Sequence, residues 1–382
     1  MTHVTQDTIV NFAKRKGFVY PGSDIYGGLA NTWDLGNLGV KMVHNIKQAW
    51  RRNFVLNSLD MVELDAGILM NQKVWEASGH TATFSDLLID DKDTKHRFRV
   101  DHLIEDQHGI DVEGWDTVRI NALITEKSLV NPHTNKPGNW TEARTMNLMF
   151  ETNRDKTNIA NPETRVYLRP ETAQGIFVQF KNILITERPK IPFGVAQIGK
   201  AFRNEITPGN FLFRVIEFEQ MEIEYFVREE NWNTAFDLWL AREEDFLFNI
   251  LQIKKDNIQR KEHPPEKLSH YSKKSIDLEY NYFGLGFKEL WGLAYRTNYD
   301  LTVHATSSQQ KLEYIDVDGS KFIPHVIEPS IGVGRLFLAL LLDYYHEETL
   351  EDGETRIVMK MPHSIAPFRY AILPLMKKDG LA

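Results

Sequence analysis

Residues 203–226 constrain the fold of this chain more strongly than any other segment of its sequence. Two runs rich in β-forming residues flank a Pro208-Gly209-Asn210 turn, and this arrangement predicts a β-hairpin. The first run, about residues 195–206, alternates so that Arg203 and Glu205 share one face of the strand. The hairpin therefore predicts an antiparallel sheet in at least this part of the chain.

The second run of the hairpin has two faces of different chemistry. One face carries Phe218, Gln220 and Glu222. The other face is apolar and carries Met221, Ile223 and Tyr225. A face with an arginine, an aromatic ring and carboxylates suits an anionic, aromatic ligand with a cationic end, such as a nucleotide together with an amino acid. A solvated strand face explains the same pattern, so the hairpin alone leaves both interpretations open.

Composition and charge exclude several classes of protein. The 382 residues include no cysteine, which excludes disulfides, thiolate zinc sites and cysteine nucleophiles. The N-terminal sequence lacks the apolar run of a signal peptide, and the longest apolar run, residues 336–342, is too short to span a bilayer. We therefore expect a cytoplasmic protein without membrane contact. The net charge of −8 argues against indiscriminate nucleic-acid binding but leaves RNA contact through local basic patches open.

The rest of the sequence predicts an α+β fold built on an antiparallel sheet with flanking helices. Apolar residues at helical spacing predict a helix at residues 40–55, and a Gly-x-Gly-Arg turn at 332–335 precedes an apolar helix from Leu336. No β-helix-β alternation appears, and strand patterns outnumber helices between the insertions. The strand patterns occupy residues 61–70, 146–150, 287–303, 311–317 and 321–327.

Two charged segments interrupt this pattern and predict insertions. Residues 78–144 are charged and irregular. Residues 228–275 are helix-patterned up to the breaker at residues 263–265 and are expected to be helical and then looped. We expect a sheet domain with two insertions.

Short polar patterns near these elements are candidates for a site. Thr172 precedes a helical stretch and is a candidate cap, in which case Glu171 is an ordinary surface carboxylate. Glu328 and Ser330 face the same way just before the glycine-containing turn. Arg335 lies in the first turn of the following helix, where a cation opposes the helix dipole unless an anion or a ring lies nearby. No His-Glu-x-x-His pattern and no P-loop motif is present, so phosphate binding would have to come from arginines and an aromatic residue on strands.

Seven stretches, in order along the chain, match the motifs of one family. They are YGGLANTWD at 26–34, WEASGH at 75–80, RPETAQGIFVQFKN at 169–182, AFRNEITPGNF at 201–211, FEQMEIEYF at 218–226, ELWGLAYRTNYDLTVH at 289–304 and PHVIEPSIGVGR at 324–335. Together they resemble class II aminoacyl-tRNA synthetases, and within them the glycyl-tRNA synthetases of the dimeric type. The resemblance covers nearly the whole chain and implies ATP-dependent activation of glycine, followed by transfer of glycine to tRNA(Gly).

The resemblance implies a role for each matching residue on the ATP side. Arg203 would bind the α-phosphate, and Phe218 and Arg335 would lie on either side of adenine. Glu289 is implied as a further ATP contact and as a neighbour of Mg²⁺. The implied ATP set is Arg203, Asn204, Glu205, Phe213, Arg214, Phe218, Glu289, Leu290, Gly332 and Arg335, of which Arg203 and Arg335 are catalytic through charge stabilisation.

The resemblance also implies an acidic pocket for glycine. The implied residues are Arg99, Glu171, Phe218, Gln220, Glu222, Glu328 and Ser330. Glycine has no side chain to bind, so recognition must use its ammonium group. Carboxylates that converge on a small site repel one another unless a cation joins them, and the ammonium is that cation. Beyond ATP with Mg²⁺, neither zinc nor an organic cofactor is expected.

The sequence departs from the family at two places. Residues 35–39 read Leu-Gly-Asn-Leu-Gly where the family usually has Tyr-Gly-Pro-Leu-Gly, and Ile216 stands where many members have a second arginine. A contact to phosphate or to the acceptor end of tRNA is therefore in doubt. Because the arginines at 203, 214 and 335 are retained, we expect activity to be weakened at most.

The resemblance implies domain boundaries and partners as well. Residues 1–365 match the catalytic domain, and residues 366–382 match only the opening of an anticodon-binding domain, with a strand-like segment at 370–375. The implied partners are ATP, glycine, tRNA and a second copy of the chain. The helix at 40–55 suits either that dimer interface or the core.

Two alternatives keep the same fold. A non-catalytic synthetase-like protein, such as an accessory subunit of a mitochondrial polymerase, would bind nucleic acid, but such relatives tend to lose the arginines that this chain keeps. A class II synthetase for another small amino acid is the nearer alternative. The set Glu171, Glu222, Glu328 and Ser330 favours glycine.

Overall fold

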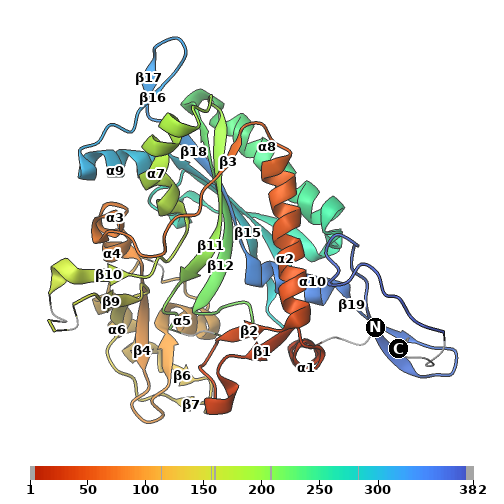
Figure 1. The fold of residues 1–382 in the computed structure, drawn as a ribbon. Coiled ribbons are helices and arrows are strands. Elements are labelled where there is room, and N and C mark those ends of the chain that lie inside the picture. The colour runs from red at the N-terminus through yellow and green to blue at the C-terminus, as the bar shows by residue number, and fades with distance from the viewer. Residues whose placement is uncertain are drawn as a thin grey trace.

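The computed structural model describes residues 5–112, 114–155, 157–158, 161–206, 209–282 and 284–375. Its centre is a seven-stranded sheet in the order β13-β14-β15-β18-β12-β11-β3, with helices on its faces (Figure 1). The predicted α+β class is confirmed. The sheet is antiparallel except at one edge, where β3 pairs in parallel with β11, so the prediction of an antiparallel sheet is wrong there. No hairpin joins these two strands, and nothing in their long connection forces them to be antiparallel.

The elements have the following bounds. The strands of the main sheet are β3 (Met61–Glu63), β11 (Phe193–Phe202), β12 (Glu217–Val227), β13 (Ile258–Glu262), β14 (Lys274–Tyr282), β15 (Gly286–Thr297) and β18 (His325–Gly332). The α-helices are α1 (Gln6–Lys16), α2 (Asn37–Arg51), α3 (Gln72–Ala77), α4 (His80–Thr83), α5 (Val100–His108), α6 (Thr117–Lys127), α7 (Ala173–Thr186), α8 (Trp232–Asp245), α9 (Tyr299–Ser308) and α10 (Val333–Tyr344). The smaller sheets are formed by β1 (Val19–Pro21) with β2 (Trp33–Leu35), β4 (Ser85–Asp90) with β5 (Arg97–Arg99) and β8 (Arg144–Asn147), β6 (Val130–Asn131) with β7 (Lys136–Pro137), β9 (Glu151–Asn153) with β10 (Arg165–Tyr167), β16 (Tyr314–Ile315) with β17 (Lys321–Phe322), and β19 (Tyr345–Thr349) with β20 (Thr355–Met359).

The predicted hairpin is confirmed as the pair β11–β12, registered from Phe193 opposite Phe226 to Phe202 opposite Glu217. Its first strand is shorter than predicted, because residues 203–206 leave the sheet after Phe202. The amide of Asn204 donates to the carbonyl of Leu148 at 2.7 Å, outside the hairpin. The alternation predicted for Arg203 and Glu205 is therefore wrong. In the predicted turn, Pro208 lies outside the described residues, whereas Asn210 has a positive φ of 57° that suits a turn.

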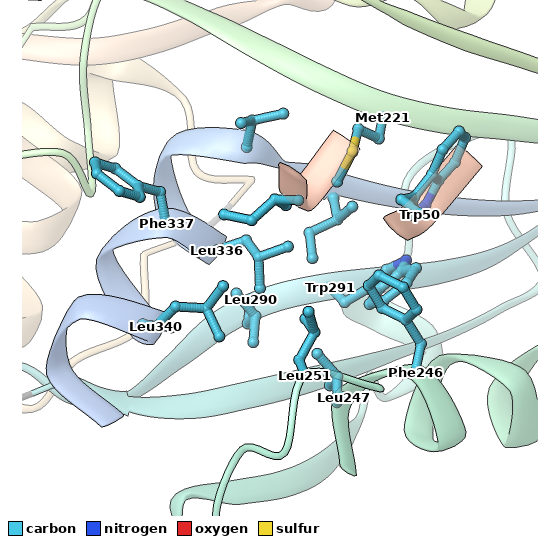
Figure 2. Packing of buried hydrophobic residues seen from close by; sticks show 14 of the residues in the cluster. Trp50, Met221, Phe246, Leu247, Leu251, Leu290, Trp291, Leu336, Phe337 and Leu340 are labelled. Carbon is cyan, nitrogen blue, oxygen red and sulfur yellow. The ribbon is translucent and has the colours of Figure 1, made fainter. Parts of the chain in front are cut away.

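The apolar face of β12 lies in the main core, as the sequence predicts. Met221, Ile223 and Tyr225 are 0%, 1% and 4% exposed and belong to one cluster with side chains of α2, α8 and α10. Figure 2 shows Met221 in this cluster with Trp50 of α2 and Leu336 of α10. Helix α2 confirms the predicted helix, and its apolar side belongs to this core through Ile46 and Trp50, whereas Val40 is 53% exposed. Of the two roles left open for this helix, core packing accounts for most of its apolar residues.

Aromatic rings concentrate where α2 continues into a short π-turn, residues Arg52–Leu56. The ring of Phe54 is fully buried and its centroid lies 5.2–5.8 Å from those of four neighbours. These neighbours are Trp50, Trp239, Phe246 and Trp291. Such packed pairs contribute beyond the area they bury, so this cluster joins α2 and α8 to the sheet.

The first insertion is not irregular, contrary to the prediction. Residues 78–144 contain β4, β5, α5 and α6, and their buried residues form a separate core with Ile104 and Ile120 at its centre. Its charged residues made the segment look irregular because they lie on the outside of small elements. The insertion packs below α3 and β10 in Figure 1.

The second insertion contributes a strand that the sequence did not indicate. Helix α8 confirms the predicted helical part, but residues 258–262 form β13, the edge strand of the main sheet. The strand β13 is mostly charged and exposed, so it lacks the alternation of a half-buried strand. Strand β14, which is buried between β13 and β15, was also missed.

Several predicted strands end differently from expectation. The patterns at 61–70 and 311–317 are strand only at Met61–Glu63 and Tyr314–Ile315. The pattern at 287–303 is strand only to Thr297, where a positive φ of 58° turns the chain into α9. Residues 370–375 pair with no strand among the described residues, and Ile372 is 96% exposed. Residues 376–382 lie outside the described residues. Within the described ranges, no helix is long and apolar enough to cross a membrane.

We expect Phe54→Ala to destabilise the fold strongly, because it empties the centre of the aromatic cluster. A buried phenylalanine truncated to alanine typically costs about 3–5 kcal/mol in the free energy of unfolding. Chemical denaturation measures this cost. The matched control is Leu56→Ala in the same π-turn, where the side chain is 57% exposed and the change should stay within about 0.5 kcal/mol. Equal losses for the two variants would contradict the assigned core.

Candidate active site

The polar face of the main sheet is only partly covered. Helix α7 packs over its upper part through Phe177 and Phe180, and the remaining surface borders two adjoining cavities. We call the first the basic cavity, because three arginines, Arg203, Arg214 and Arg335, line it. We call the second the acidic cavity, because it is lined by carboxylates that include Glu171, Glu222 and Glu328.

Arg335 is fixed at one wall of the basic cavity. Its Nη1 donates to the carboxylate of Glu289 at 2.9 Å and to the carbonyl of Glu289 at 3.1 Å, and its Nε donates to the carbonyl of Phe213 at 3.2 Å. The guanidinium also lies 4.4 Å from the centroid of the Phe213 ring. The charge of Arg335 holds the pKa of Glu289 below its ordinary value. The sequence argument that this arginine needs an anion or a ring nearby is confirmed, since both are present.

Arg203 lies where the two cavities meet. Its Nε donates to the carbonyl of Pro170 at 3.0 Å, and its guanidinium lies 5.2 Å from the Phe84 ring and 5.3 Å from the Phe218 ring. Arg214 lies nearby, with its Nε 3.9 Å from the carboxylate of Glu205. Aromatic rings and partly paired guanidinium groups on one surface suit a ligand with a ring and several negative charges.

Glu171 forms one wall of the acidic cavity and is largely buried, so its interpretation as a surface carboxylate is wrong. His80 lies 3.3 Å from one carboxylate oxygen, and the side-chain amide of Gln174 donates to the other at 3.0 Å. Burial alone would raise the pKa of Glu171, but the His80 imidazole, the charge of Arg296 and the hydrogen bond from Gln174 together hold this pKa well below its ordinary range. Glu171 therefore stays ionised.

Thr172 does not cap α7 through its side chain, contrary to the prediction. Its hydroxyl donates instead to the carboxylate of Glu222, in the interior of the cavity wall. Thr172 has helical backbone angles and is fully buried, so its hydroxyl faces the sheet and not the helix end. Burial, and after it the charge of Glu171, raises the pKa of Glu222.

Arg296 connects the acidic cavity to α9. Its Nε and Nη2 donate to the two carboxylate oxygens of Asp300, both at 2.8 Å, and its Nη1 donates to Glu328. The ring of Tyr271 lies 3.9 Å from the guanidinium. Burial raises the pKa of Glu328 to about 8, although Arg296 acts in the opposite direction. A further cation beside Glu328 would lower this pKa again.

A third carboxyl group, that of Glu224, lies close to those of Glu222 and Glu328. One oxygen each of Glu222, Glu224 and Glu328 lies within 4.8 Å of the other two, a spacing that could hold a cation. Glu224 is completely buried and does not line the acidic cavity. The polar side of β12 thus extends one residue deeper than the sequence indicated.

The two cavities share four residues, Arg203, Gln220, Glu289 and Ser330. The side-chain amide of Gln220 donates to the hydroxyl of Ser330 at 3.4 Å across β12 and β18. On the adjacent strands, Asp277 and Glu289 lie on either side of Gly292, and burial and the charge of Glu289 raise the pKa of Asp277 to about 6. A ligand in one cavity would therefore be in contact with a ligand in the other.

Most of the predicted site residues are brought together. All members of the implied ATP set except Asn204 line the basic cavity, and Glu171, Gln220, Glu222, Glu328 and Ser330 line the acidic cavity. Phe218 lines only the basic cavity. Arg99 lines neither: it lies in the first insertion, 3.0 Å from Asp86, at a separate cavity. Ile216 lines neither cavity, and its carbonyl accepts the amide of Arg203 at 2.9 Å.

Several residues of the site were missed from the sequence. Arg296, Tyr271, His80 and Asp277 contact or line the acidic cavity, and Glu224 supports it. Alternation along β15 places Arg296 on the face of Gly292, and this signal was available. It was lost because the strand was extended past Thr297, where a β-bulge and a turn redirect the chain.

The loop after β13 forms part of the roof of the acidic cavity. The cavity is lined by Lys267, Leu268, Ser269, Tyr271 and Ser272 of this loop. Lys267 also lies 2.6 Å from Asp111 of the first insertion, so the two insertions meet beside the site. The site therefore has a floor of strands and a roof of inserted segments.

The main sheet, the three arginines of the basic cavity and the carboxylates of the acidic cavity together indicate one class of protein. Comparisons with known proteins indicate the same class. Residues 155–345 match the family described as "tRNA synthetase class II core domain (G, H, P, S and T)". A prolyl-tRNA synthetase from Cryptosporidium parvum, solved with L-proline and AMP, superposes with a TM-score of 0.56 over 88% of this chain and 51% of that chain. At 9% identity this likeness shows the fold alone. The fold is that of a class II aminoacyl-tRNA synthetase.

Similar curated proteins indicate which family within this class the chain belongs to. A glycine–tRNA ligase from Caldanaerobacter subterraneus subsp. tengcongensis is 51% identical over 98% of this chain and 81% of the relative. Glycine–tRNA ligases from Alkaliphilus oremlandii and Geobacillus kaustophilus are 48% and 49% identical, over 99% of this chain and 82% and 83% of the relatives. The chain belongs to the glycine–tRNA ligase family of enzymes.

An added methyl group should have different effects on stability at Gly199 and at Gly292. A Cβ at Gly199 would lie 2.2 Å from Nη2 of Arg169, which is buried and bonded to the carbonyls of Lys200 and Ala66. We expect Gly199→Ala to destabilise the fold by about 1–3 kcal/mol through overpacking.

Gly292→Ala is the matched control for this variant. A Cβ there would meet Asp277 at 3.6 Å and Glu289 at 3.8 Å, which are ordinary contacts. Its free energy of unfolding should change by less than about 1 kcal/mol. Denaturant titration of both variants measures the difference, and a more stable Gly199→Ala than Gly292→Ala would contradict the described packing.

Proposed function

We propose that the basic cavity binds ATP and that the acidic cavity binds glycine, so that the reacting groups meet at Arg203. The observation that carries this proposal is the contact between the cavities through Arg203, Gln220, Glu289 and Ser330. The reaction is that of the family: glycine is activated by ATP and transferred to tRNA. The shared wall supports an arrangement in which the α-phosphate and the glycine carboxylate lie side by side.

On the ATP side, the proposed contacts use aromatic rings and guanidinium groups. Adenine would pack on Phe218, with Arg335 on its other side, and the phosphates would meet Arg203 and Arg214. Phe213 already stacks on Arg335 at 4.4 Å, which holds the guanidinium in place before any ligand arrives. Preorganised charge of this kind is worth more in a partly buried cavity than in water.

On the amino-acid side, the ammonium group of glycine would be bound by Glu171, Glu222 and Glu328. Burial and the charges of neighbouring carboxylates raise the pKa values of Glu222 and Glu328, and a bound ammonium would lower them by supplying a cation. Gly292 and Ala294 lie on the same face of β15 and line the floor of the cavity, which leaves room for a small substrate. Arg296, already bonded to Glu328, would orient that carboxylate.

The chemistry needs no nucleophilic side chain. An oxygen of the glycine carboxylate attacks the α-phosphorus of ATP, the bond to the bridging oxygen breaks, and pyrophosphate leaves. Arg203 would stabilise the charge on the α-phosphate, and positioning supplies most of the remaining acceleration. A ribose hydroxyl at the end of tRNA then attacks the adenylate carbonyl, and AMP leaves.

Magnesium fits the residues at the shared wall. The carboxylates of Asp277 and Glu289 approach the same point above Gly292, to within 3.6 and 3.8 Å, and oxygen ligands are those that Mg²⁺ prefers. We propose Glu289 as its principal protein neighbour. Bound there, Mg²⁺ would neutralise charge on the phosphates.

We also propose a homodimer, as in the dimeric type of the family. The core position of α2 leaves little of its apolar face for an interface. Exposed apolar side chains gather instead on the segment from β1 to β2, which includes the short helix Asp24–Tyr26. They are Tyr20, Ile25, Tyr26, Leu29 and Leu35, with exposed fractions of 40–88%. A cytoplasmic location fits the cysteine-free composition and a tRNA partner.

The domain boundary near residue 365 remains a proposal. Ile365 is fully buried against the core, and the side-chain amide of Asn45 donates to the carbonyl of Ala366 at 2.8 Å. Beyond it, Lys41 of α2 lies 3.7 Å from the ring centroid of Phe368, and Phe368 and Tyr370 are 57% and 84% exposed. Limited proteolysis should cut between residues 366 and 375 and leave 1–365 intact; cleavage first inside the catalytic part would contradict the boundary.

We expect Arg203→Ala to abolish glycine-dependent ATP–pyrophosphate exchange without unfolding the protein. Losing one charge-stabilising donor typically lowers the rate by roughly a hundred- to a thousandfold. The matched control is Lys200→Ala, three residues earlier in β11, whose side chain pairs with Glu217 at the surface. Exchange by Arg203→Ala within threefold of the parent would remove the central support of the assignment.

Glu222→Gln and Glu328→Gln should each raise the KM for glycine far more than the KM for ATP. Each change removes one charged acceptor for the ammonium, and such a hydrogen bond is worth roughly 1.5–3 kcal/mol, about ten- to a hundredfold in affinity. Glu219→Gln is the control, because Glu219 lies on the opposite face of β12 and pairs with Lys47 at 3.0 Å. A larger effect on ATP than on glycine would show that the acidic pocket is misassigned.

The double variant Ile25→Asp, Leu29→Asp should sediment as a monomer if the β1–β2 segment forms the dimer interface. Two charges on an apolar contact are costly to bury. Val118→Asp, at a 77% exposed position on α6, should leave the parent's association state unchanged. Sedimentation velocity distinguishes these outcomes, and a dimeric double variant would place the interface elsewhere.

A further inference from the structure

Glu224 is the one carboxyl group of the acidic cluster that the proposed chemistry leaves without a task. It is 0% exposed, and neither of its carboxylate oxygens has a hydrogen-bond partner among the described residues. It lies two residues beyond Glu222 on the same face of β12, beside Glu328 of β18, within the 4.8 Å spacing of the three groups. A fully buried polar group without a partner requires an explanation.

The charged groups around Glu224 come from four elements. Glu222 lies on its own strand, Glu328 on β18, Arg296 on β15 and Asp300 on α9. On its other side, β11 places Val195 opposite Glu224 and neutral Gln197 one step along the same face. Helix α7, which packs on β12, carries one charged residue, Lys181, which bonds Gln310 at the surface.

Arg296 is therefore the single cation that faces Glu224 within the described residues, and it is already engaged. Two of its nitrogens donate to Asp300 at 2.8 Å, and a third donates to Glu328. An ionised Glu224 would add a third negative charge beside Glu222 and Glu328 in a site closed to water. An unpaired buried charge costs several kcal/mol, whereas a neutral acid avoids most of this cost.

We propose that Glu224 is a neutral carboxylic acid in the working enzyme and a positioning residue that holds Glu222 and Glu328 from behind as acceptors for the substrate's ammonium group. A neutral carboxylic acid has one O–H to donate, and Glu222 and Glu328 each have a carboxylate oxygen within 4.8 Å of one on Glu224. The O–H can turn toward one of these two acceptors at a time. Burial, and after it the charge of Glu328, raises the pKa of Glu224 well above its ordinary value, which agrees with this assignment.

The protonation of Glu224 determines the total negative charge of the carboxyl groups around the substrate's ammonium group. Two ionisable carboxyls and one permanent acid can accept a single cation without leaving an unbalanced third charge. Because Glu224 is neutral, no buried cation is needed beside Glu222 and Glu328 to balance its charge. The inference rests on the proposed binding of glycine by Glu222 and Glu328, but the protonation of Glu224 can be tested without substrate.

The substrate-free test compares the thermal stability of the parent and Glu224→Gln between pH 5 and pH 8.5. The raised pKa of Glu224 means that folding retains a proton that the unfolded chain loses above about pH 4.3. The parent should therefore lose stability as the pH rises from that value toward the folded pKa, whereas Glu224→Gln lacks this loss. We expect the two proteins to melt together near pH 5 and the variant to melt several degrees higher at pH 8.5.

Glu217→Gln is the control for this comparison, because Glu217 lies on the same strand but is exposed and pairs with Lys200. Its difference from the parent should not grow with pH. A Glu224→Gln variant that is less stable than the parent, most of all at high pH, would show an ionised Glu224 paired with a bound cation and would overturn the proposal. A difference independent of pH would overturn it as well.

Kinetics then separate positioning from mere packing. Glu224→Gln keeps a hydrogen-bond donor and should retain the parent's KM for glycine within about threefold, whereas Glu224→Ala should raise that KM and leave the KM for ATP unchanged. A hundredfold rise for Glu224→Gln would mean that Glu224 acts as a charge, against the proposal. If Glu222→Gln and Glu328→Gln leave the glycine KM unchanged while the stability pattern holds, the glycine pocket fails and the neutral acid stands.

Discussion

The polar half of this molecule depends on one buried guanidinium group. Arg296 is 1% exposed and bonds Asp300 and Glu328, while the ring of Tyr271 covers one of its faces. Gln174 extends the same network, since its amide donates to both Asp300 and Glu171, and His304 contacts its carbonyl oxygen at 2.7 Å. Without Arg296, the buried carboxyl groups of Asp300 and Glu328 would lose their ion-pair partner, and an unpaired buried charge is costly.

Strand β12 connects this network with the rest of the fold. Met221, Ile223, Tyr225 and Val227 lie in the large apolar core with α2, α8 and α10, and the alternate residues Phe218, Gln220 and Glu222 line the cavities on the other face. Because the two sets alternate along one backbone, the rigidity of the core is passed directly to the polar side chains. Acidic groups can be brought so close together only where packing on the other face prevents the strand from moving away.

The sequence predicted correctly the elements whose structure is determined by residue patterns along the chain. The alternation of β12 predicted its two faces, and helical spacing predicted α2, α8 and α10. It failed where tertiary contacts decide: β13 is charged and exposed yet pairs at the sheet edge, and Arg203 leaves the strand because Asn204 bonds Leu148 of a distant segment. Arg296 and Glu224 were missed because their importance comes from burial and from the charges around them, which are set by contacts among β15, β18 and α9 and not by spacing along the chain.

The three clustered carboxyls lie on two adjacent strands in the middle of the main sheet. One oxygen of each group lies within 4.8 Å of the other two, and the hydrogen bonds between β12 and β18 fix where the three side chains start. The backbone ladder therefore acts as a ruler for these three carboxyl groups. A ruler of this kind cannot stretch by small steps, because a strand keeps its register or loses it entirely. Substitutions elsewhere in the chain can therefore change the stability of the protein without changing the distances among these carboxyl groups.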